Sequence, residues 1–124
     1  MSSVPNTDSP EVGPLPDPAD LLHLAVVVVD EGTGIVAHVS GEVDMATCGR
    51  LRDAIEPHLG PGQRVVLDLS GVTFMDSSCL AVLEQARTTL TEDGGSLILR
   101  NPSKAARHLL SVTGMSKLFA IEIG

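Results

Sequence analysis

The spacing of apolar residues changes once within residues 64–90, and this change limits the possible folds more than any other feature of the chain. The first half opens with the short apolar run Val65–Leu67, which is typical of a buried strand. A turn is predicted at Gly71, before a second apolar group that comprises Val72, Phe74 and Met75. In the second half, apolar residues recur at helical spacing and form one stripe: Cys79, Val82, Leu83, Ala86 and Leu90. A strand that leads into an amphipathic helix indicates mixed α and β structure.

The remaining segments repeat this alternation. Residues 21–29 and 35–39 are predicted to form two strands joined by a glycine-containing turn, and residues 45–59 a helix. A further strand is expected at 96–99, a helix at 103–112 that Ser103 caps, and a last strand at 119–123. The predicted order is therefore ββαβαβαβ, an α/β (α+β-like) fold with a mixed sheet of about five strands and helices packed on it. Residues 1–20 hold five of the eight prolines and are predicted to be a disordered leader before one domain at 21–124.

Composition excludes several classes of function. The formal net charge of −8 disfavours binding to nucleic acid or to an anionic membrane and would suit a basic partner surface. Only Phe74 and Phe119 are aromatic, which leaves no platform for base stacking. Cys48 and Cys79 form no CxxC motif, and no paired histidine cluster suggests a metal. Without a membrane-length apolar run or a signal peptide, we expect a cytoplasmic protein with reduced cysteines.

Asp76, Ser77 and Ser78 stand where the helix of the central stretch begins, and three interpretations apply to them. Asp and Ser are favoured helix N-caps, which alone would account for their presence. A catalytic serine would need a base and an elbow of the G-x-S-x-G type, and the sequence places no histidine beside this segment. A phosphorylation site is the third interpretation, because the positive end of a helix dipole tolerates an added anion.

Glu42 and Asp44 follow the second predicted strand and also allow two interpretations. They can be a strand-end charge and a helix cap, with Thr47 as an alternative cap. Alternatively, their connection lies beside the serine segment, and the carboxylates form an acidic rim for docking a partner.

Three segments resemble the STAS domains, in particular the small bacterial anti-sigma-factor antagonists. LDLSGVTFMDSSCLAVL at 67–83 is similar to the signature of that group, in which a D-S-S/T-G sequence carries the phosphorylated serine. GEVD at 41–44 resembles the exit of the family's second strand, and VTGMSKLFAIE at 112–122 resembles its closing segment. The segments occur in the family's order and span nearly the whole chain from residue 21.

This resemblance implies a switch and no enzyme. The chain would bind an anti-sigma factor that is also a serine kinase and release a sigma factor; phosphorylation of Ser78 would end the interaction, and a metal-dependent serine phosphatase would restore it. No cofactor or metal is implied, and the protein would be a monomer or weak dimer. The alternative is an accessory STAS subunit of a transport or signalling assembly that is never phosphorylated. The residues expected to contact the partner are Glu42, Asp44, Asp76, Ser77, Ser78 and Cys79.

The sequence departs from the family motif at Cys79, which replaces the glycine after the phosphorylated serine. Glycine allows the backbone of a partner to approach closely, and a cysteine side chain would hinder this approach. Because Cys79 also falls on the apolar stripe, we expect it to pack in the core. The departure itself favours the accessory-subunit alternative.

Overall fold

The computed structural model describes residues 23–124, so the predicted leader at 1–20 lies outside the described residues. One sheet contains five strands, β1 (Leu24–Asp30), β2 (Ile35–Val43), β3 (Arg64–Met75), β4 (Ser96–Arg100) and β5 (Ala120–Glu122). The helices are α3 (Cys48–Ile55), α4 (Leu80–Glu92) and α5 (Lys104–Val112), with short 3₁₀ turns η1 (Glu56–His58), η2 (Ser77–Cys79) and η3 (Met115–Lys117). The predicted order ββαβαβαβ is confirmed.

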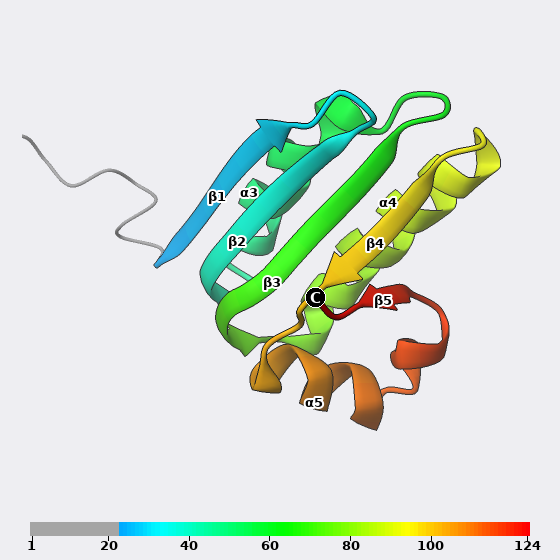
Figure 1. Cartoon of the computed structure of the whole chain (residues 1–124). Helices are drawn as coiled ribbons and strands as arrows, with labels where there is room; N and C mark the ends of the chain where they lie inside the picture. Colours follow the sequence, from blue (N-terminus) through cyan, green and yellow to red (C-terminus); the bar gives the residue numbers. More distant parts are fainter. Residues whose placement is uncertain (1–22) are drawn as a thin grey trace, which may run out of the picture.

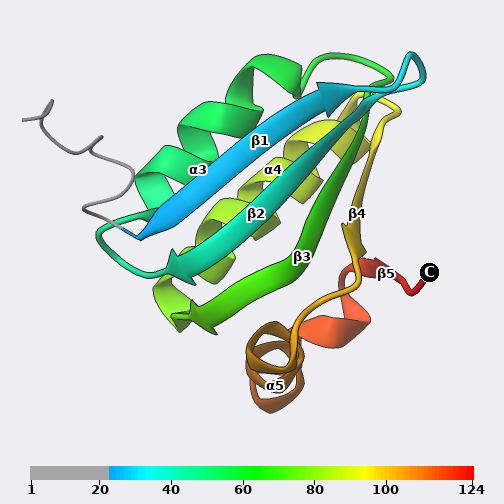
Figure 2. The ribbon, with the colours of Figure 1, turned by 60° about the vertical axis from the view of Figure 1, so that its left-hand side comes forward.

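The strands lie in the sheet in the order of the chain, from β1 to β5. β1 is antiparallel to β2, and every later pair is parallel, so a helical crossover follows each of β2, β3 and β4. Figures 1 and 2 show α3 and α4 side by side on one face of the sheet, with α5 near the C-terminal end of β3. β2 and β3 therefore end at the same edge of the sheet. No helix of the described residues is long and apolar enough to cross a membrane.

The core lies between the sheet and the helices, and β1 contributes only one of its faces to it. Leu24 is 1% exposed, whereas Val27 and Val29 are 59% and 43% exposed. The continuous apolar run at 21–29 is typical of a buried strand, but this strand is buried on one face only. β1 is an edge strand, and α3 and α4 cover only one side of the sheet, so alternate valines of the apolar run face outwards.

The turn predicted at Gly71 is also wrong, because β3 continues without interruption from Arg64 to Met75. A Cβ atom at Gly71 would lie 2.8 Å from the Cβ of Ser40 on the neighbouring strand. The glycine therefore allows two backbones to approach closely next to an irregularity in the pairing of β2 and β3. The second apolar group thus extends the same strand.

The helix predicted at 45–59 is shorter in the structure and begins at Cys48. The carboxylate of Asp44 accepts hydrogen bonds from the backbone N–H groups of Ala46 and Thr47 at 2.9 and 3.0 Å. These local bonds hold the residues after β2 in a turn. Met45, which was assigned to the apolar stripe of this helix, is consequently 75% exposed.

The C-terminal segments follow the prediction closely. Ser103 caps α5 through its Oγ atom, which accepts the N–H of Ala106 at 3.2 Å. Gly114 ends this region in the left-handed conformation, with φ of 74°. Phe119 is buried, and the strand after it is limited to three residues because β5 pairs only with the end of β4.

Candidate functional site

The serine segment and the acidic connection lie side by side because they follow neighbouring parallel strands. Val43 at the end of β2 is aligned with Met75 at the end of β3. Across this edge, the backbone N–H of Asp76 donates to the carbonyl of Val43 at 2.8 Å, and the thiol of Cys79 donates to the carbonyl of Asp44 at 3.2 Å. The structure thus brings the two predicted halves of the site into direct contact.

Asp76 forms the cap that its residue type predicts. Its backbone is extended, with φ of −93° and ψ of 143°, and its carboxylate accepts the N–H of Ser78 at 2.9 Å. The chain then makes the 3₁₀ turn η2 and continues as α4. Ser77 and Ser78 are both exposed, so a kinase can reach either hydroxyl at the start of this helical segment.

Asp44 organises the neighbouring connection in a similar way. In addition to its bonds to the turn after β2, its N–H donates to the hydroxyl of Thr47 at 2.8 Å. That hydroxyl donates to the carbonyl of Glu42 at 2.8 Å, and Thr47 is only 1% exposed. Thr47 thus occupies the N-cap position of α3 and fixes the connection from inside, whereas the carboxylate of Asp44 holds the turn before the helix.

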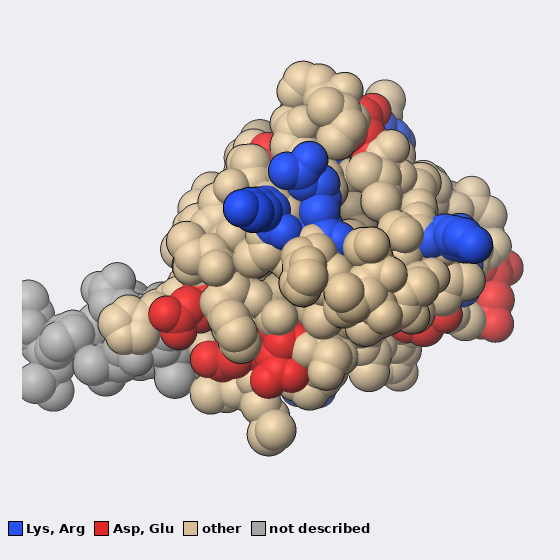
Figure 3. Space-filling view, turned by 90° about the horizontal axis from the view of Figure 1, so that it is seen from below, with Lys and Arg blue, Asp and Glu red and all other residues tan. Residues whose placement is uncertain are grey.

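The acidic side chains of the serine segment and of the neighbouring connection have no basic partner among the residues that the structure describes. Within residues 23–124, none of Glu42, Asp44 and Asp76 forms an ion pair with a basic side chain. Figure 3, which looks at the molecule from below, shows Asp and Glu side chains gathered on one part of this end and Lys and Arg side chains on an adjacent part. The structural role of Asp44 leaves its charge available, so the docking interpretation of Glu42 and Asp44 stays a prediction.

Two exposed apolar residues lie on the same connections and were not identified as site residues from the sequence. Phe74, near the end of β3, is 49% exposed, and Met45 directly follows Asp44. Their apolar character alone does not distinguish an exposed position from a buried one. Methionine and aromatic residues are enriched in surfaces that bind other proteins.

Cys79 is the predicted partner-binding residue whose side chain cannot reach a partner, because it is fully buried. Its predicted packing in the core is confirmed. Burial, followed by the neighbouring thiol of Cys48, raises the pKa of Cys79 to about 12. The cysteine therefore does not hinder the approach of a partner with its own side chain, and it stays protonated at neutral pH.

The histidine contacts of residues 23–124 do not involve the serine segment. His38 lies on β2, where its ring is 3.4 Å from the carboxylate of Asp68 on β3. In the described part of the chain, no histidine is hydrogen-bonded to Ser77 or Ser78, and no group of acidic, histidine and cysteine residues could hold a metal ion.

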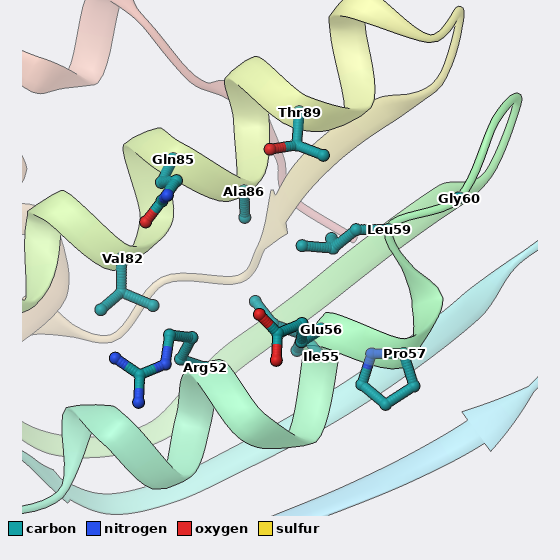
Figure 4. A pocket seen from close by; sticks show the side chains of 10 residues that line it. All are labelled: Arg52, Ile55, Glu56, Pro57, Leu59, Gly60, Val82, Gln85, Ala86 and Thr89. Atoms are coloured by element: carbon teal, nitrogen blue, oxygen red, sulfur yellow. The ribbon is translucent and has the colours of Figure 1, made fainter.

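A cavity of about 700 Å³ lies between α3 and α4, and no sequence motif indicated it. Figure 4 shows Ile55, Leu59 and Val82 beside it, with the charged ends of Arg52 and Glu56 at its margin. The residues around it come from the end of α3, from residues 56–60 and from α4, so none of them belongs to the serine segment.

The capping bond at Asp76 gives a testable prediction. Asp76→Ala should lower the free energy of unfolding by about 1 kcal/mol, because the N–H of Ser78 loses its acceptor. Urea unfolding followed by circular dichroism measures this change, and Asp76→Asn, which keeps a capping oxygen, is the control. Equal stability of wild type and Asp76→Ala would contradict the capping role.

Comparison with known proteins identifies relatives over most of the chain. The family described as "Mlab, STAS domain" matches residues 27–121. The anti-sigma-B factor antagonist of Bacillus subtilis (strain 168) is 28% identical over 100 residues, 81% of this chain and 92% of the relative. The anti-sigma-B factor antagonist of Listeria monocytogenes is 31% identical over 85 residues, 68% of this chain and 75% of the relative. The crystal structure of an anti-sigma factor antagonist from Mycobacterium paratuberculosis is 32% identical with a TM-score of 0.68, covering 80% of this chain and 85% of that chain.

Proposed function

The chain belongs to the STAS domain family, and on this basis we propose that it is an anti-sigma-factor antagonist switched by phosphorylation of Ser78. In its unphosphorylated form it binds an anti-sigma factor that is also a serine kinase, and a sigma factor is released. The chain is the substrate of this kinase and is not itself an enzyme. A serine phosphatase restores the binding form.

The observation that carries the proposal is the composition of one surface, which we call the serine face. It combines two exposed hydroxyls, exposed apolar side chains and uncompensated carboxylates on two touching connections, with Glu42, Asp44, Met45, Phe74, Asp76, Ser77 and Ser78 as its members. Met45 and Phe74 supply the apolar area that protein interfaces concentrate at their centre. The carboxylates favour a partner with basic residues around that centre.

Phosphorylation of Ser78 would change this face without unfolding the domain. A phosphate adds roughly −1.5 to −2 charges and three acceptor oxygens. The start of a helical segment tolerates these charges, because the helix dipole is positive at that end. A partner surface with apolar or acidic groups opposite Ser78 would instead lose affinity, and the bound complex would dissociate.

The decisive experiment measures the affinity of the anti-sigma kinases of the source organism for wild type, Ser78→Ala and Ser78→Asp. Wild type and Ser78→Ala should bind alike. Ser78→Asp should bind at least about tenfold more weakly, a loss of about 1.4 kcal/mol. Ser111→Asp adds the same charge at an exposed position of α5 and serves as the control. If all variants bind alike, charge at Ser78 does not control binding and the residue has only a structural role.

A kinase assay separates the two serines. The preceding serine should be dispensable, so Ser77→Ala should still be phosphorylated, whereas Ser78→Ala should not. Phosphorylation that persists in Ser78→Ala would contradict the assignment of Ser78. If no anti-sigma kinase binds the protein, the accessory subunit of a transport or signalling assembly becomes the better proposal.

A further inference from the structure

The two cysteines of the chain meet directly beneath the serine face. The thiol of Cys79 donates to the carbonyl oxygen of Asp44 at 3.2 Å, and the backbone N–H of Cys48 donates to the same oxygen at 2.9 Å. Cys48 is the first residue of α3, and Cys79 is the last residue of η2. One carbonyl oxygen thus joins the two residues although they lie on different connections.

We propose that Cys48 and Cys79 are a modification site at which hydrogen peroxide produces an intramolecular disulfide, linking the connection after β2 to the serine segment. Nothing in the function of an anti-sigma-factor antagonist requires these thiols. A disulfide between them would affect binding because it joins the two halves of the serine face.

The environments of the two thiols determine which one reacts with peroxide first. Cys48 is partly exposed and free, so its thiolate is the one that reaches peroxide, whereas Cys79 is fully buried. The Cys48 thiolate attacks one peroxide oxygen, the O–O bond breaks, and a sulfenic acid and hydroxide form. The Cys79 sulfur then loses its proton and attacks the Cys48 sulfur, the S–O bond breaks, and hydroxide leaves. Two thiols and one peroxide give one disulfide and two waters.

Oxidation of Cys48 also prepares Cys79 for the second step. In the reduced protein the neighbouring Cys48 thiol is the second cause, after burial, of the raised pKa of Cys79. Conversion of Cys48 to a sulfenic acid removes this neighbouring thiol as a cause of the raised pKa. The Cys79 sulfur can also move away from the carbonyl oxygen of Asp44. That oxygen keeps two hydrogen bonds, from the N–H groups of Thr47 and Cys48 at 3.1 and 2.9 Å.

The link would alter the serine face, and this consequence rests on the proposed function. To bond to Cys48, the side chain of Cys79 must turn away from the carbonyl of Asp44. Ser78 directly precedes Cys79 in the same 3₁₀ turn, so its position relative to Asp44 changes with it. We therefore expect the oxidised protein to bind the anti-sigma kinase at least about tenfold more weakly than the reduced protein.

The first test uses the full-length protein alone. After exposure to peroxide, blocking of free thiols and digestion with trypsin, mass spectrometry should detect peptides 1–50 and 65–87 joined by a disulfide, because these peptides carry Cys48 and Cys79. Dithiothreitol should separate them. Oxygen added to the sulfur of Cys48 while Cys79 stays reduced, a disulfide-linked dimer on a non-reducing gel, or unreacted thiols would each overturn the proposal.

The second test compares the affinity of the same anti-sigma kinase for reduced protein, oxidised protein, and oxidised protein treated with dithiothreitol. Cys48→Ser exposed to peroxide is the control, since it cannot form the link but retains the exposed Met45, which peroxide also oxidises. If dithiothreitol restores the affinity and peroxide does not change the affinity of Cys48→Ser, the disulfide weakens kinase binding. Unchanged affinity of the linked protein would overturn it, and failure of the reduced protein to bind any kinase would instead count against the proposed function.

Discussion

Replacement of Gly41 by alanine is expected to destabilise the domain by about 3 kcal/mol, because two costs coincide at this position. Gly41 has φ of +98°, a conformation that residues with a side chain rarely adopt. In addition, an added Cβ would lie 2.0 Å from the carbonyl oxygen of His23, which accepts the N–H of Glu42 at 2.8 Å. The alanine would push β1 and β2 apart immediately before the acidic connection.

Urea unfolding of Gly41→Ala and Gly32→Ala separates the two costs. Gly32 also has a positive φ, of +84°, but a Cβ atom there would have no neighbour within 4 Å. Gly32→Ala should therefore cost only about 1 kcal/mol, the conformational part alone. If both variants were equally stable, the close approach to His23 would not contribute.

Leu83→Ala should lower the free energy of unfolding by about 3 kcal/mol, since the truncation leaves a cavity in addition to the lost burial. Leu83 is 0% exposed and holds α4 against the sheet. Leu118→Ala is a suitable control because Leu118 is 45% exposed, and it should change stability by less than about 1 kcal/mol. A loss below about 1 kcal/mol for Leu83→Ala would mean that the core closes around the missing side chain.

Most of the fold could be predicted because local patterns and the overall architecture agree. The helical stripe from Cys79 to Leu90 and the cap at Ser103 each depend on a few neighbouring residues. The errors arise where a contact distant in sequence determines the conformation. Gly71 has the composition of a turn, but its role depends on Ser40 in the neighbouring strand.

The candidate site was predictable only in part. Asp76 and Ser78 carry a local capping pattern and a family resemblance, so both were identified from the sequence. The exposure of Met45 follows from side-chain bonds of Asp44 to the backbone, which no periodicity reveals. The meeting of Cys48 and Cys79 depends on the alignment of β2 with β3, which the sequence does not specify.

The contact between the two connections forms only in the folded protein. The bonds from Asp76 to Val43 and from Cys79 to Asp44 join segments more than 30 residues apart, and they exist only when β2 and β3 are paired. A nascent or misfolded chain contains the same serines but no assembled surface. A partner that binds this surface would therefore not bind unfolded chains. The regulatory signal would then depend on the number of folded molecules and not on the number synthesised.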